Sequence, residues 1–173
     1  KPTIAAVNGF GSRANVKSLV WYSPTAFEEN GYRVPRTMKQ LWALAQDMVE
    51  DGFTPWCLGV EAFGVSGWPA TDWVEELLLR QSGPEVYDQW ARNAIPFTDS
   101  AVENAFAAFG DALLGVEQTL GGLGDILNTS VQRAGDPLLS DPPGCLMYRQ
   151  ASFQVDNLPA GTTIGPDGDV DVF

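Results

Sequence analysis

Short apolar runs that alternate with amphipathic, helix-period segments constrain the fold of this chain more than any other feature of its sequence. Residues 18–22, 56–60 and 146–148 form such runs, each close to turn-forming residues, and we predict a strand at each. A long segment with helical periodicity lies between the first two runs, and several more follow the second. This order predicts an α/β fold with a central sheet flanked by helices, rather than a helical bundle or a β-sandwich.

The segment after residue 36 carries the strongest helix signal. Thr37 and Gln40 have the spacing of a capping box, and Gly52 marks the C-terminal end of the segment. An apolar stripe at helical spacing runs between them and consists of Met38, Leu41, Trp42, Leu44, Ala45, Met48 and Val49. We therefore expect this helix to pack on the sheet, with Trp42 in the core.

Shorter helical segments are predicted along the rest of the chain, at about 23–31, 67–83, 84–90, 99–109 and 123–134. Thr71 or Asp72 is a suitable N-cap for the second of them. Trp73 and Trp90 fall on apolar helical faces, so we place both in the core. Additional strands are predicted at 4–7, before a glycine turn at 9–11, and at 169–173.

The charge and composition of the chain exclude several classes of function. The net charge is −12, and such a surface repels nucleic-acid phosphates and anionic membranes, whereas a neutral partner is compatible with it. The chain has no histidine, which rules out Ser-His-Asp, Cys-His and histidine-liganded metal chemistry. Residues 167–171 resemble the start of a calcium loop, but Val172 stands where that loop needs glycine. We expect no metal site and no cofactor.

The two cysteines, Cys57 and Cys145, are too few for a zinc site and suit a single disulfide in an oxidising compartment. Composition alone leaves two unrelated buried thiols equally open. Each cysteine, however, lies beside a predicted buried strand. If these strands are neighbours in the sheet, the two Cα atoms fall within about 4.4–6.8 Å, and we predict that the disulfide forms.

Three segments, at 14–24, 67–73 and 142–153, resemble the substrate-binding proteins of carbohydrate ABC importers, especially the α-glucoside type. They occur in the family's order and cover most of the chain. The resemblance implies one lobe of a periplasmic-binding-protein type II fold, formed by residues 1–173 as a single domain. It also implies that the sugar lies between two lobes. We therefore expect this chain to be the second lobe, with the first lobe and the C-terminal return outside it.

A neutral sugar needs aromatic faces for its C–H groups and polar side chains for its hydroxyls. Trp68 lies in a glycine–proline turn before a helix, and it is either a core residue or a ligand-stacking residue. Phe153 falls where relatives of the maltose-binding type have a stacking tryptophan, so the resemblance implies stacking, with a packing role as the alternative. Gln150, on the same turn, is a candidate for hydrogen bonds to the sugar.

Further candidates for contact with the ligand come from loops and from the crossover strand that the resemblance implies. Glu61 and Asp72 are candidate acceptors for hydroxyls, although Asp72 has a helix-capping role as its alternative. Gly122, after Gly121, lets backbone amides approach a ligand or simply forms a turn. Asn15 and Lys17 share one face if that strand is extended.

The function that the resemblance implies is that of a substrate-binding component without catalytic activity. Its partners would be a neutral mono- or oligosaccharide and the membrane permease subunits of an ABC importer. The protein would be periplasmic or extracellular, and held at the cell surface by a lipid anchor outside this chain. A glycoside hydrolase fragment is one alternative, although Asp72, Glu75 and Glu76 crowd one helix start, where acids favour the dipole. The other alternative is a non-catalytic protein-interaction module.

Overall fold

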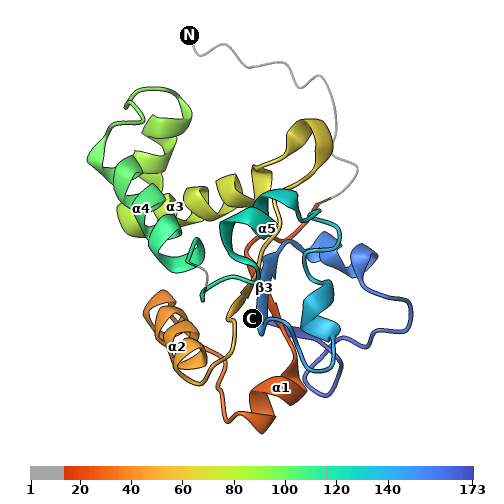
Figure 1. The fold of residues 1–173 in the computed structure, drawn as a ribbon. Coiled ribbons are helices and arrows are strands. Elements are labelled where there is room, and N and C mark those ends of the chain that lie inside the picture. Colours follow the sequence, from red (N-terminus) through yellow and green to blue (C-terminus); the bar gives the residue numbers. More distant parts are fainter. Residues whose placement is uncertain (1–13, 116) are drawn as a thin grey trace.

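The computed structural model describes residues 14–115 and 117–173 (Figure 1). A mixed four-stranded sheet in the order β2-β3-β1-β4 forms its centre. The strand β1 pairs antiparallel with β3 and with β4, whereas β2 pairs parallel with β3. The strands are β1 Leu19–Tyr22, β2 Trp56–Cys57, β3 Met147–Gln150 and β4 Asp171–Val172.

The predicted strands within the described residues are confirmed in position, although β2 and β4 are shorter than expected. Their register sets Val20 opposite Arg149 and Trp21 opposite Tyr148. All four residues of β3 are buried, because strands or chain segments flank it on both sides and both of its faces are covered. The strand predicted at 4–7 and the turn at 9–11 lie outside the described residues.

Helices and 3-10 turns surround this sheet (Figure 1). The α-helices are α1 Pro24–Glu29, α2 Met38–Glu50, α3 Trp68–Ala91, α4 Ser100–Leu113 and α5 Gly122–Asn128. The 3-10 turns are η1 Phe63–Val65, η2 Asp136–Leu139 and η3 Ser152–Asn157. The sheet flanked by helices confirms the predicted fold class. Among the described residues, no helix has the length and apolar character needed to cross a membrane.

Capping side chains fix the helix starts that the sequence predicted. The hydroxyl of Thr37 accepts a hydrogen bond from the Gln40 amide at 3.2 Å, and the Asp99 carboxylate accepts from the Ala101 amide at 2.9 Å. The Gln40 side chain reaches back to the amide of Arg36 at 2.8 Å rather than to that of Thr37. These bonds satisfy amides that a helix start otherwise leaves without partners.

The helix α3 contains a break where the sequence predicted two helices. Gly83 has φ +81° and ψ 170°, outside the helical region, and Pro84 follows it. Proline disfavours a helical conformation in the residue before it and lacks an amide for the helical bond. The predicted boundary at residues 83 and 84 is therefore confirmed.

The helix α5 ends at Asn128, well before the predicted end at residue 134. Thr129 is extended, and its carbonyl accepts a hydrogen bond from the Glu61 amide at 3.0 Å. The Glu61 carbonyl accepts in turn from the Val131 amide at 2.9 Å. Residues 129–131 therefore pair with Glu61 instead of continuing the helix. The helix predicted for 129–134 was wrong.

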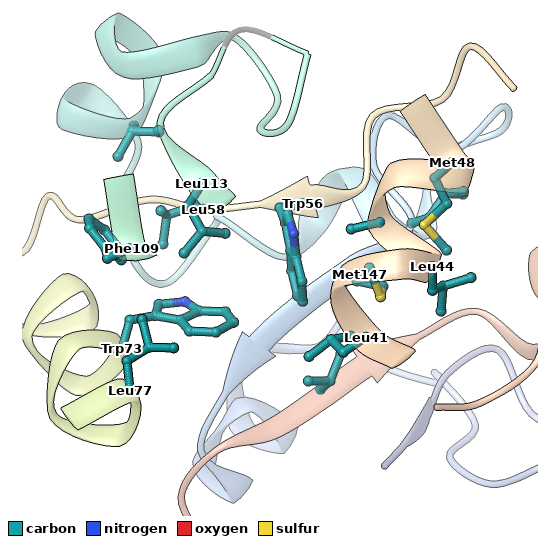
Figure 2. Packing of buried hydrophobic residues seen from close by; sticks show 14 of the residues in the cluster. Leu41, Leu44, Met48, Trp56, Leu58, Trp73, Leu77, Phe109, Leu113 and Met147 are labelled. Carbon is teal, nitrogen blue, oxygen red and sulfur yellow. The ribbon is translucent and has the colours of Figure 1, made fainter. Parts of the chain in front are cut away.

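The main core lies between the sheet and helices α2, α3 and α4 (Figure 2). Trp56 is 1% exposed and packs edge-to-face on Trp73, with ring centroids 5.3 Å apart. Trp42 stacks on Trp73 at 5.9 Å but is only half-buried, and Trp90 is half-buried as well. Both were expected in the core. Each lies at its margin instead, Trp42 beside a groove between α2 and α4, and Trp90 against Phe97 after α3.

A second cluster lies around the disulfide. Cys57 and Cys145 are bonded to each other, with Cα atoms 5.5 Å apart, and both are buried. They meet because β2 and β3 are parallel neighbours, as the prediction required. Trp21, Tyr148 and Val170 pack in the same cluster. The predicted disulfide is therefore confirmed.

Candidate functional site

Most of the candidate binding residues meet at one end of the molecule. We call this group the Trp68 cluster, and it consists of Asn15, Lys17, Trp68, Asp72, Ser152 and Phe153. The ring of Trp68, at the start of α3, lies 5.9 Å from the ring of Phe153 in η3, with an interplanar angle of 60°. Both rings are half-buried, so each retains an exposed part. The predicted partial exposure of Trp68 is confirmed.

Lys17 and Asp72 form the polar side of the cluster. The Lys17 ammonium lies 5.1 Å from the centre of the Trp68 ring and 2.5 Å from Oδ2 of Asp72. Asp72 does not cap α3, because the helix begins at Trp68 after Gly67 and its cap has no side-chain hydrogen bond. The capping role considered for Asp72 and for Thr71 was therefore wrong. The Asp72 carboxylate is instead beside the aromatic pair.

The segment at 15–17 reaches the cluster through Ser152. The Val16 amide donates to Ser152 Oγ at 3.1 Å, and the Ser152 amide donates to the Val16 carbonyl at 2.8 Å. The Ser152 hydroxyl also donates to Asn15 Oδ1 at 3.5 Å. These bonds join the segment before β1 to η3 and thereby hold Asn15 near Phe153.

Gln150 does not contribute to the exposed surface of the cluster. It is 3% exposed, its Nε2 donates to the Tyr148 hydroxyl at 3.1 Å, and its Oε1 accepts from the Ala151 amide at 2.8 Å. Both ends of the amide are thus used inside the protein. In this structure the Gln150 amide shapes the turn after β3 rather than the exposed surface.

Glu61 and Gly122 also serve the local backbone. Glu61 Oε1 accepts from the Phe63 amide at 2.7 Å, within the loop that leads to Trp68. The buried Gly122 donates its amide to the Thr119 carbonyl at 2.9 Å. The amide of Gly122 itself is therefore already used within the turn that begins α5. The Glu61 carboxylate thus shapes the loop that leads to the cluster.

Arg149 lies beneath the cluster, and the sequence analysis did not single it out. Its side chain is 6% exposed and pairs with Glu76 at 2.5 Å. The guanidinium also donates to Ser18 Oγ at 2.7 Å and to the Asp72 carbonyl at 3.1 Å. It lies 4.6 Å from the centre of the Trp73 ring. A charge directly after the strand predicted at 146–148 was the available signal, because an unpaired charge is not stable where a strand is buried.

The pair between Arg149 and Glu76 stays ionised. Burial alone raises the pKa of Glu76, but hydrogen bonds from Ser18 and Arg149 and the charge of Arg149 outweigh it. The pKa of Glu76 consequently lies below its ordinary value. Glu76 is therefore not a protonated acid near neutral pH.

Hollows in the surface adjoin the polar side of the cluster. One of about 500 Å³ is lined by Lys17, Ser18, Asp72, Glu75, Glu76, Leu79, Arg80, Tyr87 and Arg149. Aromatic faces beside paired charges suit a ligand with apolar C–H faces and neutral hydroxyls. Within the part of the chain that the structure describes, no group of three or more acidic or cysteine side chains is arranged to hold a metal ion.

Comparison with known sequences points to one family. The family of bacterial extracellular solute-binding proteins matches residues 5–141. The alpha-glucosides-binding periplasmic protein AglE of Rhizobium meliloti (strain 1021) is 44% identical over 169 residues. The osmoprotective compounds-binding protein GgtB of Synechocystis sp. is 43% identical over 167 residues. The matches cover 98% and 96% of this chain but only 37% and 39% of those relatives.

Solved structures show the same fold. The bacterial solute receptor AcbH, whose described substrate preference is β-D-galactopyranose, superposes with a TM-score of 0.73 and 28% identity. The match covers 92% of this chain and 37% of AcbH. A chitin oligosaccharide binding protein gives the same TM-score at 18% identity, over 97% of this chain and 40% of its own, and supports the fold alone. The expected fold is thereby confirmed.

Proposed function

This chain belongs to the bacterial extracellular solute-binding protein family, and on that premise we propose that it forms one lobe of a sugar receptor. The receptor would serve an ABC importer from the periplasmic or extracellular side of a membrane. Its ligand would be a neutral α-glucoside or oligosaccharide, bound in a cleft between this lobe and another. The observation that carries the proposal is the partly exposed pair of Trp68 and Phe153 beside Lys17 and Asp72.

The chemistry of the cluster favours a neutral polyhydroxylated ligand. The rings of Trp68 and Phe153 meet at 60°, so they offer two differently oriented faces to the C–H groups of a pyranose. Lys17 supplies donors and Asp72 supplies acceptors for hydroxyls. Because these two charges neutralise each other, the cluster has no net charge that would select an ionic ligand.

The alternatives raised by the sequence fit the geometry less well. A glycosidase needs two carboxyl groups on either side of the scissile bond, one of them protonated to act as the acid. Here Asp72 is paired with Lys17, and Glu76 is paired with Arg149 and has a lowered pKa. We therefore propose a non-catalytic role. The family membership of the chain favours a sugar receptor over a protein-interaction module. Incubation with maltose, sucrose and trehalose tests the proposal, and hydrolysis of any of them would contradict it.

Affinity provides the direct test. A receptor of this kind closes two lobes around its ligand, and each lobe supplies part of the contacts. If a complete site binds at about −8 kcal/mol, half of its contacts leave about −4 kcal/mol, which is millimolar. We expect titration calorimetry to detect little heat when α-glucosides are added to residues 1–173. We expect clear binding when the two-lobed protein is used.

Variants of the two-lobed protein distinguish the cluster from the rest of the lobe. Trp68→Ala and Phe153→Ala should each weaken sugar binding by about tenfold, because each removes a stacking face. Trp90→Phe, at the far end of α3, is the matched control and should leave affinity unchanged. Unchanged affinity in both cluster variants would reject this site. A two-lobed protein that binds no sugar of the panel would reject the function.

A further inference from the structure

Two buried amide side chains lie on either side of Phe153, which forms one half of the aromatic pair. Gln150 is 3% exposed and Gln154 is 2% exposed, whereas Phe153 between them retains an exposed part. A buried amide is stable only when it is hydrogen-bonded, because it has lost its contacts with water. The partners of these amides therefore show which parts of the chain they hold in place.

Gln150 fixes the start of the turn that carries Phe153. Its Oε1 accepts from the Ala151 amide at 2.8 Å, and its own carbonyl accepts from the Trp21 indole at 3.1 Å. The Ala151 carbonyl accepts in turn from the Gln154 amide at 3.0 Å and closes the first turn of η3. The position of Phe153 thus depends on Gln150 through the backbone of Ala151.

The hydroxyl of Tyr148 extends this network away from η3. It accepts from Gln150 Nε2 at 3.1 Å and donates to the Val131 carbonyl at 3.1 Å. Burial raises the pKa of Tyr148 to about 12, so the hydroxyl keeps its proton near neutral pH. It therefore acts as acceptor and donor at once, and joins two segments of the chain.

Val131 continues the connection to the chain before Trp68. The Val131 amide donates to the Glu61 carbonyl at 2.9 Å. The loop that follows Glu61 is closed by the Gly67 amide, which donates to the Val60 carbonyl at 2.8 Å. Trp68 comes next, as the first residue of α3. Hydrogen bonds and short stretches of backbone therefore connect the two rings of the aromatic pair through the interior of the protein.

The ring of Tyr148 has little room to move within this network. It is 2% exposed, and Gly135 lies against it. A Cβ atom at position 135 would lie 2.8 Å from Tyr148 Cδ1 and 3.0 Å from Gln154 Nε2. The φ of Gly135 is −86°, so glycine serves here for space rather than for its backbone freedom. Close packing of this kind holds the hydroxyl of Tyr148 in one place.

We propose that Tyr148 and Gln150 are positioning residues that set the relative orientation of Trp68 and Phe153 for sugar binding. This inference rests on the sugar-binding function proposed above. Both side chains are buried, so they act through the two rings, which lie 5.9 Å apart at an angle of 60°. Rings that are already ordered lose less freedom when a ligand binds, so more of the contact energy contributes to affinity.

Substitutions in the two-lobed protein test the network. Affinity is measured by titration calorimetry for the tightest ligand among maltose, trehalose and sucrose. Tyr148→Phe removes only the shared hydroxyl, and Gln150→Met removes the amide at similar volume. Each should weaken binding by about three- to tenfold, because a stacking face is then held in a poorer orientation. Tyr32→Phe is the matched control, since it removes a hydroxyl bonded to Asp51 at the end of α2, and it should leave affinity unchanged.

Combination with Phe153→Ala separates positioning from a purely structural role. If Gln150 acts through the ring of Phe153, its replacement has no ring left to displace in the Phe153→Ala protein. Gln150→Met should therefore weaken binding in that background by less than about twofold, compared with about three- to tenfold in the wild type. A loss by the same factor in both backgrounds would overturn the inference.

The remaining outcomes separate this inference from the proposed function. Unchanged affinity in Tyr148→Phe or in Gln150→Met would overturn the inference, and so would an equal loss in Tyr32→Phe. If circular dichroism shows that one of the two network variants does not fold, the other decides. A two-lobed protein that binds none of the three sugars would reject the function and the inference together. Weaker binding in Trp68→Ala and Phe153→Ala, with none in the network variants, rejects the inference alone.

Discussion

Arg149 connects the buried sheet to both flanks of the Trp68 cluster. It donates to Ser18, next to Lys17, and to the carbonyl of Asp72, whose side chain pairs with Lys17. Ser18 has a φ of +65°, so the segment before β1 is held in a disfavoured conformation at this contact. A single buried guanidinium thus fixes the backbone on either side of the polar pair.

Replacement of Arg149 by methionine should destabilise the protein by about 3–5 kcal/mol, because it leaves the Glu76 carboxylate buried without its partner. Denaturant unfolding of this disulfide-bonded chain measures the loss. The double variant Arg149→Met with Glu76→Gln should recover part of it, since no unpaired charge remains. Arg92→Met is the control, because Arg92 and Asp88 form an exposed pair that is worth little. If Arg149→Met and Arg92→Met lowered the free energy of unfolding by the same amount, the prediction would be contradicted.

The lowered pKa of Glu76 predicts a dependence of stability on pH. A carboxyl group whose pKa is lower in the folded state stabilises the fold above its unfolded pKa, and this contribution is lost as pH falls through the folded pKa. The free energy of unfolding should therefore fall more steeply between about pH 5 and pH 3 in the wild type than in Glu76→Gln. Glu103→Gln, on the exposed side of α4, should retain the wild-type slope. Parallel curves for all three proteins would refute the assignment.

Single residues also show which features of the site the sequence could predict. The exposure of Trp68 followed from its glycine–proline turn, which is a local signal. The buried positions of Arg149 and Gln150 were not predictable, because they depend on which face of β3 each residue occupies and on what covers that face. The faces of β3 depend on its pairing with β1, where Val20 lies opposite Arg149. That register comes from segments more than 120 residues apart.

At the scale of elements, local signals predicted where helices begin more reliably than where they end. Thr37 and Asp99 cap their helices through side chains within three residues, so a short stretch of sequence contains the whole signal. The end of α5 depends on the pairing of Glu61 with the segment after Thr129, which is distant in sequence. Tertiary hydrogen bonds there outweigh the local helical pattern.

The burial of three tryptophans predicts how much stability each loses on replacement by alanine. Trp56 is almost completely buried, Trp42 is half-buried at the margin of α2, and Trp68 is half-buried at the start of α3. Trp56→Ala should cost about 3–5 kcal/mol, Trp42→Ala less, and Trp68→Ala least. Urea melts followed by circular dichroism measure the order. A larger loss for Trp68 than for Trp42 would mean that Trp68 belongs to the core.

At the scale of the whole molecule, the order of strands and helices predicted the α/β fold, whereas the assembly of the site depended on the chain path. The segment at 15–17, the start of α3 and η3 are far apart in sequence, and they meet through Ser152 and through the Trp68–Phe153 contact. The resemblance suggested that these segments share a function. The contacts among them became visible only in the structure, because they depend on long-range packing.

The disulfide crosslinks two segments of the chain that are distant in sequence. Cys57 and Cys145 are 88 residues apart in sequence, and both are buried where β2 lies next to β3. A crosslink that closes a loop of this length restricts the unfolded chain and should stabilise the fold on the order of 4 kcal/mol in the chain-entropy model. The protein should therefore unfold at a lower urea concentration after reduction, or in the Cys57→Ala, Cys145→Ala double variant.

Thiol titration tests the same bond directly. The protein denatured without reductant should show no reactive thiol, and reduction before titration should reveal both cysteines. Two reactive thiols before reduction would refute the bond. Because β2 is only two residues long and pairs with β3 at Cys57, loss of the crosslink should release this edge of the sheet first. Amide hydrogen exchange should accordingly rise at Cys57 more than at β1, which is paired on both sides within the sheet.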